Sequence, residues 1–86
     1  MSATKLLSKL KSILSAEHKA QMKKYDSLKK VLKSLRVEKR RLKEELSQVS
    51  EEQQREEIQS QLTVVSKQRK KGLKVLKNLK KKKNSD

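Results

Sequence analysis

Several residue types are scarce or missing in this 86-residue chain. It has no cysteine, proline, phenylalanine or tryptophan, and only one tyrosine and one glycine. The absence of cysteine excludes disulfides and thiolate metal sites. A single aromatic side chain cannot form the row of rings on which single-stranded bases stack. Apolar residues make up 31% of the chain, which is too few for a deep globular core.

The residue types that carry chemistry are also sparse. His18 is the only histidine, and no serine or carboxylate is placed to complete a catalytic triad with it. One glycine is too few for a phosphate-binding loop. The carboxylates between residues 44 and 57 alternate with Arg and Lys, which is typical of a helix surface. We therefore predict a protein that is not an enzyme, with no catalytic residues, no metal site and no cofactor.

Long hydrophobic runs are absent too. No stretch approaches the roughly 18 to 20 apolar residues that a membrane-spanning helix needs. Lys9 and Lys11 interrupt the apolar residues near the N-terminus, which does not fit a secretory signal. We expect an intracellular, cytoplasmic protein.

What the chain does contain is two apolar stripes with alternating three- and four-residue steps, the spacing of one helix face. Paired antiparallel, each couple of residue numbers sums to 104. The charged or small residues in the stripes pair as Lys39 with Val65, Arg69 with Leu35 and Gly72 with Leu32. The predicted seam consists of Tyr25, Leu28, Leu32, Leu35, Leu42 and Leu46 on one side, and Ile58, Leu62, Val65, Leu76 and Leu79 on the other.

The two stripes are out of phase with each other, so one straight helix cannot keep both on one face. A turn near residues 49–54 resolves the conflict. Ser50 and Gln53 match a capping box for the start of a second helix. A single long bent helix with two different partners is the alternative.

We predict an all-α fold: an antiparallel, coiled-coil-like helical hairpin that forms oligomers. The first helix would have about 45 residues and the second about 28, fraying near Lys80. The first helix is expected to run through residues 15–24, although its apolar face is interrupted there and a break is possible. The expected organisation is an N-terminal amphipathic segment at 1–22, a hairpin at 23–81 and a disordered basic tail at 82–86.

The N-terminal segment has the cleanest amphipathic pattern. In the hairpin arrangement the second helix does not reach residues 3–20, so their apolar stripe would be uncovered. Exposed contiguous apolar surface usually marks an interface. We expect self-association, with docking on a protein partner or on an anionic membrane as alternatives. The predicted assembly face is Leu6, Leu7, Leu10, Ile13 and Leu14.

The net charge of +15 is unevenly distributed along the chain. Residues 1–37 carry net +8, residues 38–57 net −2 and residues 58–86 net +9. A hairpin would place the two basic arms side by side, and a polyanion or added salt would relieve their repulsion. The residues predicted to bind a polyanion are Arg36, Arg40, Arg41, Lys43, Lys67, Lys70, Lys71, Lys74, Lys80 and Lys81.

The leading hypothesis is a small basic binding protein that contacts the nucleic acid backbone, or another polyanion, with little sequence preference. It would self-assemble through its N-terminal stripe. The alternative is an assembly or adaptor protein, similar to a scaffold or chaperone, that docks its amphipathic helix on a protein partner. Peripheral binding to an anionic membrane ranks third.

Overall fold

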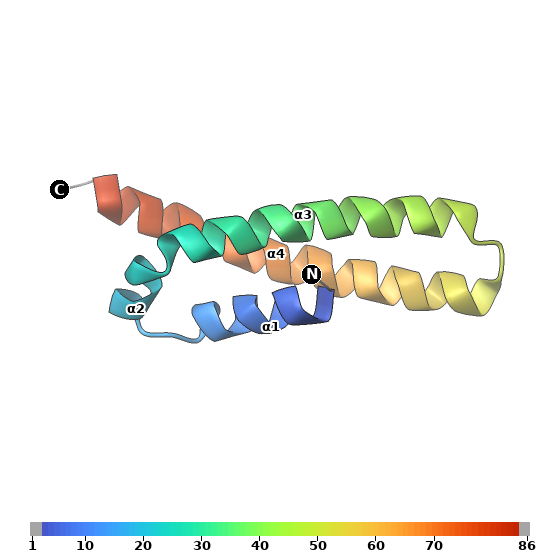
Figure 1. The fold of residues 1–86 in the computed structure, drawn as a ribbon, viewed down its shortest axis with the longest axis horizontal. Coiled ribbons are helices and arrows are strands. Elements are labelled where there is room, and N and C mark those ends of the chain that lie inside the picture. The colour runs from blue at the N-terminus through green and yellow to red at the C-terminus, as the bar shows by residue number, and fades with distance from the viewer. Residues whose placement is uncertain (1–2, 85–86) are drawn as a thin grey trace.

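The computed structural model describes the backbone of residues 3–84 and the side chains of residues 3–81. This part of the chain is all-helical, which confirms the predicted class. It forms a rod of 52 × 19 × 18 Å (Figure 1). The helices are α1 (Ala3–Leu14), α2 (His18–Lys23), α3 (Tyr25–Gln48) and α4 (Glu52–Asn84).

The two long helices, α3 and α4, run side by side in opposite directions (Figure 1). Apolar residues at three- and four-residue steps put their side chains between the helices, and burial of each leucine contributes about 1.5–3 kcal/mol. Tyr25, Leu46 and Leu76 are only partly buried there. The buried members are Leu28, Leu32, Leu35 and Leu42 of α3, and Ile58, Leu62, Val65 and Leu79 of α4.

The connection between α3 and α4 is short, and one side chain of α4 caps the C-terminal end of α3. Arg55 donates from Nη1 to Leu46 O at 2.7 Å and to Val49 O at 3.0 Å. These are carbonyls at the C-terminal end of α3, where no later N–H group can reach them. The first backbone bond of α4 is Arg55 N–H to Glu51 O at 3.0 Å. The helix therefore starts one residue later than the Ser50 capping box predicts.

The predicted helix lengths are wrong. The first helix is not continuous, because α1 ends at Leu14 and the chain reverses before α2. Gln21 Nε2 donates to Ile13 O and Leu14 O, both at 3.2 Å, and so satisfies carbonyls at the end of α1. α4, with 33 residues, is longer than α3, with 24. It extends past Lys80 to Asn84, so most of the expected disordered tail is helical, and residues 85–86 lie outside the described residues.

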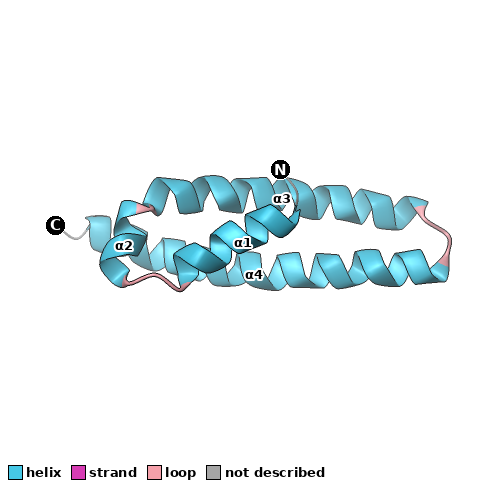
Figure 2. Cartoon of the chain, turned by 60° about the horizontal axis from the view of Figure 1, so that its bottom comes forward, coloured by secondary structure: helices cyan, strands magenta, loops and turns pink. Residues whose placement is uncertain are grey.

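The reversal lays α1 over the space between α3 and α4, and α1 contacts both helices (Figure 2). Leu6, Leu10 and Ile13 are 2%, 0% and 5% exposed. The expected uncovered stripe at residues 3–20 is therefore wrong, because the chain covers it with its own long helices. The gain from burying three large side chains explains why the weakly apolar stretch at 15–24 breaks.

The three helices α1, α3 and α4 meet at the only glycine of the chain. A Cβ atom at Gly72 would lie 2.6 Å from Leu32 Cδ2 and 3.0 Å from Leu10 Cδ1. The absence of a side chain there lets α1 and α3 both contact α4 at one level.

Candidate polyanion-binding face

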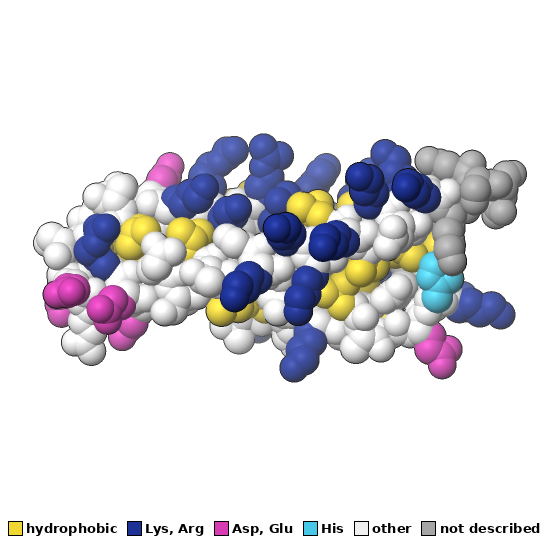
Figure 3. Space-filling model, turned by 180° about the vertical axis from the view of Figure 1, so that it is seen from behind, with side chains coloured by type: hydrophobic (Ala, Val, Ile, Leu, Met, Phe, Trp, Pro, Cys, Tyr) yellow, Lys and Arg dark blue, Asp and Glu magenta, His cyan; other side chains and the backbone are white. Residues whose placement is uncertain are grey.

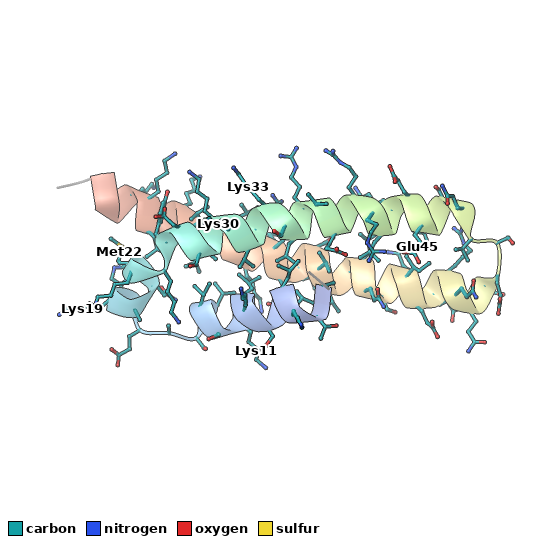
Figure 4. All side chains as sticks on the ribbon, viewed as in Figure 1. Lys11, Lys19, Met22, Lys30, Lys33 and Glu45 are labelled. Carbon is teal, nitrogen blue, oxygen red and sulfur yellow. The ribbon has the colours of Figure 1, made fainter. Side chains whose placement is uncertain are left out.

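A stripe of five cations follows one side of α3. Lys29, Lys33, Arg36, Arg40 and Lys43 recur at three- and four-residue steps and are all exposed. Three of them, Lys29, Lys33 and Lys43, are each two positions along the chain from Ser27, Val31 and Arg41, respectively, which line hollows beside α1. A shift of two residues turns about 200° around a helix. The stripe therefore lies on the side of α3 opposite α1, as Figure 4 shows for Lys33.

α4 contributes cations to the same side of the rod. Its residues Val64, Gln68 and Lys71 line the hollow beside α1. Lys70, Lys77 and Lys80 are on the opposite side of α4, flanking the seam. On each helix these cations lie about a quarter turn from the seam, in the direction in which the chain winds. In an antiparallel pair, these two sides face the same way, so the two rows of cations flank one groove. We call these eight residues, five from α3 and three from α4, the cationic face.

The cationic face is hollowed at one place. A hollow of about 230 Å³ is lined by Arg36, Lys39, Arg40 and Lys43 of α3 and by Arg69 of α4. Lys39 and Arg69 are the two charged residues that interrupt the apolar stripes, and both are half-buried. Their stems lie along the seam while their charged ends reach its edge. We call these five residues the cation hollow.

Arg69 is held in place by the neighbouring helix. Its Nε donates to Leu32 O at 3.2 Å, across the seam. None of the five cations of the hollow forms an ion pair with a carboxylate among the described residues. Their mutual repulsion is therefore uncompensated in the free protein, and an anion in the hollow would relieve it.

Carboxylates are concentrated elsewhere. Figure 3, the view from behind, shows a group of acidic side chains at the turn end of the rod, with Lys and Arg side chains along much of the remaining length and isolated acidic side chains elsewhere. Glu51, Glu52, Glu56 and Glu57 belong to the turn and the first turns of α4. The fold therefore separates the two signs of charge along the rod, as the charge distribution in the sequence suggests.

Arg41 is one predicted polyanion-binding residue that the structure places outside the cationic face. Its guanidinium pairs with Glu38 at 2.9 Å and with Glu45 at 3.1 Å. The hydrogen bond to Glu38 raises the pKa of Arg41 and the charge of Glu38 reinforces this, while burial lowers the pKa and the charge of Glu45 raises it further. The Arg41 charge is therefore already compensated.

The other predicted cations fall on three sides. Arg36, Arg40, Lys43, Lys70 and Lys80 are on the cationic face, and Lys67 and Lys74 are on the outer side of α4. Lys71 lines the hollow beside α1, and Lys81 lines a hollow with His18 and Gln21 of α2. Sequence reasoning grouped cations by runs of neighbours and so missed several members. The missed members are Lys29, Lys33 and Lys77. These cations could have been found in the sequence from their three- and four-residue spacing, which follows one side of the apolar stripe.

The residues of the predicted assembly face pack into the core. Leu6, Leu10 and Ile13 are buried within the chain, and Leu7 and Leu14 are partly buried against the same core. Self-association and docking through this stripe stay predictions, but the exposed surface from which they were argued is absent. Exposed apolar side chains occur at Val37, Val64 and Leu73 instead.

His18 is exposed at the start of α2. No helix within residues 3–84 combines the length and apolar character needed to cross a bilayer. No protein family, curated protein or solved structure matches this chain.

Proposed function

We propose that the protein binds nucleic acid through the phosphate backbone, with little sequence preference, and that the cationic face is the contact surface. In this proposal α3 and α4 act as a stable helical hairpin that holds the two rows of cations side by side. Binding releases the counterions condensed on the nucleic acid, which supplies the free energy. Assembly through α1 has no part in the proposal because its apolar stripe is buried.

The single observation that carries the proposal is a continuous row of unpaired cations on the side opposite α1. On α3 the row runs from Lys29 to Lys43, which is about 21 Å of helix. This is about one cation per 5 Å, compared with about one phosphate per 3.4 Å of each duplex strand. The cations on α4 add to this row, so the density of positive charge on the face comes closer to the density of phosphates on the strand.

The side chains available also argue against sequence reading. The eight residues of the cationic face are all Lys or Arg, and none of them is an Asn or Gln that could pair with adenine. Tyr25 is the only aromatic residue and is partly buried against the core. Contacts to phosphate position a protein on nucleic acid but do not specify a sequence.

The test is fluorescence anisotropy of a labelled DNA duplex of about 20 base pairs and of a scrambled duplex, at two salt concentrations. With 6–10 phosphate contacts, affinity should fall by roughly 10³ to 10⁵ between 50 and 200 mM salt. The two sequences should bind within a few-fold of each other. A salt-independent affinity would overturn the proposal.

A pair of charge-matched variants locates the surface. The face variant is Arg36→Gln, Arg40→Gln and Lys43→Gln, and its control is Lys67→Gln, Lys71→Gln and Lys74→Gln on the other sides of α4. Both variants lose three charges from exposed positions. The face variant should lower the salt slope by about 2.7, at 0.9 per lost contact, and the control by much less. Equal losses would show that net charge alone, and not this face, governs binding.

A further inference from the structure

The cation hollow is more concentrated in charge than the rest of the cationic face. Its residues on α3 span positions 36–43, about two helical turns, and Arg69 closes it from α4. Its volume of about 230 Å³ is below the roughly 300–1,000 Å³ of pockets that hold drug-sized ligands. A small, highly charged anion fits these dimensions.

The number of cations in the hollow indicates how much negative charge its ligand carries. Five cations line the hollow, with no carboxylate among the lining residues. An internal phosphodiester carries one negative charge and would leave most of this repulsion uncompensated. A terminal phosphoryl carries up to about two charges at neutral pH, so a linear chain of three phosphates carries about four. Of these phosphate groups, the short chain with a terminal phosphoryl best matches five cations.

Arg69 gives the hollow a preorganised donor. Its Nε is occupied by Leu32 O, and its Nη1 and Nη2 groups have no acceptor among the described residues. The bond across the seam restricts the guanidinium before a ligand arrives, which lowers the entropic cost of binding. The guanidinium then offers paired N–H donors, a geometry that suits phosphate oxygens.

We infer that the cation hollow binds the oligophosphate group: a short linear chain of phosphates with a terminal phosphoryl. The inference deepens the proposed function and rests on it, since the hollow shares Arg36, Arg40 and Lys43 with the face proposed to contact nucleic acid. Two sources carry this chemistry, a 5′-triphosphate end of an RNA strand and inorganic polyphosphate. In both, the recognised group is the phosphate chain and not a base or sugar.

The experiment is calorimetric titration of the full-length protein with inorganic tripolyphosphate and with orthophosphate at 150 mM salt. Tripolyphosphate should bind at least about tenfold more tightly, because it reaches several of the five cations at once. A second arm compares an RNA oligonucleotide bearing a 5′-triphosphate with the same oligonucleotide bearing a 5′-hydroxyl. An advantage for the triphosphate end would identify an RNA end as the source, and tripolyphosphate binding without that advantage would identify inorganic polyphosphate.

Single substitutions test whether the ligand binds in the hollow. Arg69→Gln should lower tripolyphosphate affinity by about tenfold, and Lys74→Gln, which removes the same charge from the outer side of α4, by less than about twofold. Arg40→Gln is the second variant in the hollow, and because Arg40 is exposed its replacement leaves the core undisturbed. Circular dichroism confirms that each variant is helical.

The outcomes separate the inference from the function on which it rests. Equal losses in Arg40→Gln and Lys74→Gln, or no preference for tripolyphosphate over orthophosphate, would overturn the inference. If the 5′-hydroxyl RNA still binds with a steep salt dependence, backbone binding stands while the oligophosphate site falls. If neither RNA nor tripolyphosphate binds, both fall.

Discussion

Gly72 shows how one residue decides whether three helices can meet. Its missing side chain leaves room for Leu10 and Leu32, which are 0% and 2% exposed. Glycine in a helix interior costs about 1 kcal/mol relative to alanine. At this position the cost is offset by close packing of α1 and α3 on α4. The sequence predicts that Gly72 faces Leu32, but it does not predict the contact with Leu10.

Replacement of Gly72 tests this balance. Gly72→Ala gains about 1 kcal/mol of helix propensity, but two buried leucines must shift, and overpacking typically costs about 1–3 kcal/mol. We expect a net loss of up to about 2 kcal/mol, and a larger loss for Gly72→Val. Urea unfolding followed by circular dichroism measures both.

The control for this prediction is Gln59→Ala, at an exposed position of α4 where only propensity changes. It should stay within about 0.5 kcal/mol of the wild type. A Gly72→Ala variant that is more stable than the wild type would show that the leucines relax freely and that close approach is not required.

At the scale of elements, both chain reversals use the same device. A side chain from the following segment donates to the last carbonyls of the preceding helix: Gln21 to the end of α1, and Arg55 to the end of α3. No glycine supplies a left-handed cap at either reversal, since the only glycine is in α4. Side chains from the next helix supply the missing donors.

Arg55→Ala tests the second reversal. Alanine favours helix, so the change removes the cap without weakening α4 through propensity. Loss of two hydrogen bonds and of a cation near a helix C-terminus should cost about 1 kcal/mol. For a domain of this size that lowers Tm by about 4–8 °C, measurable by thermal circular dichroism. Arg55→Lys keeps the charge and should recover part of the loss. An unchanged Tm for Arg55→Ala would show that water serves these carbonyls equally well.

At the scale of the whole molecule, net charge opposes compactness. The chain carries +15, and the cationic face and the outer side of α4 keep cations close together without acidic partners. Carboxylates at the turn end are too far along the rod to compensate fully, because screening limits each charge to about 10 Å at 0.1 M salt. The folded state is therefore under electrostatic strain at low ionic strength.

The expected consequence is that sodium chloride stabilises the free protein. Raising it from 50 to 500 mM should raise Tm, since screening removes more repulsion than attraction. The control is Lys67→Glu with Lys74→Glu, which lowers the net charge from +15 to +11 at exposed positions. Its Tm should depend less on salt. A Tm that falls with salt in the wild type would contradict the argument.

Much of the helical arrangement is predictable from the sequence, and the failures have specific causes. The three- and four-residue steps identify eight of the eleven predicted seam residues as buried, because helical spacing is a local property. The continuous first helix fails, because helix propensity over residues 15–24 is outweighed by burial of Leu6, Leu10 and Ile13 on distant helices. Arg41 pairs with Glu38 and Glu45 of its own helix, a contact that grouping cations by runs of neighbours does not reveal, and its place in a polyanion site stays a prediction.

The order of residues by itself determined the helical class, the two apolar stripes and the separation of charge along the chain, since these depend only on spacing between neighbours. The tertiary structure alone decided which side of the α3–α4 pair is covered. α1 occupies the side where Gly72 leaves room and apolar positions meet it, and this depends on contacts between segments far apart in the chain. The cations on the opposite side are consequently left together, with the cation hollow at the point where Arg69 crosses to α3.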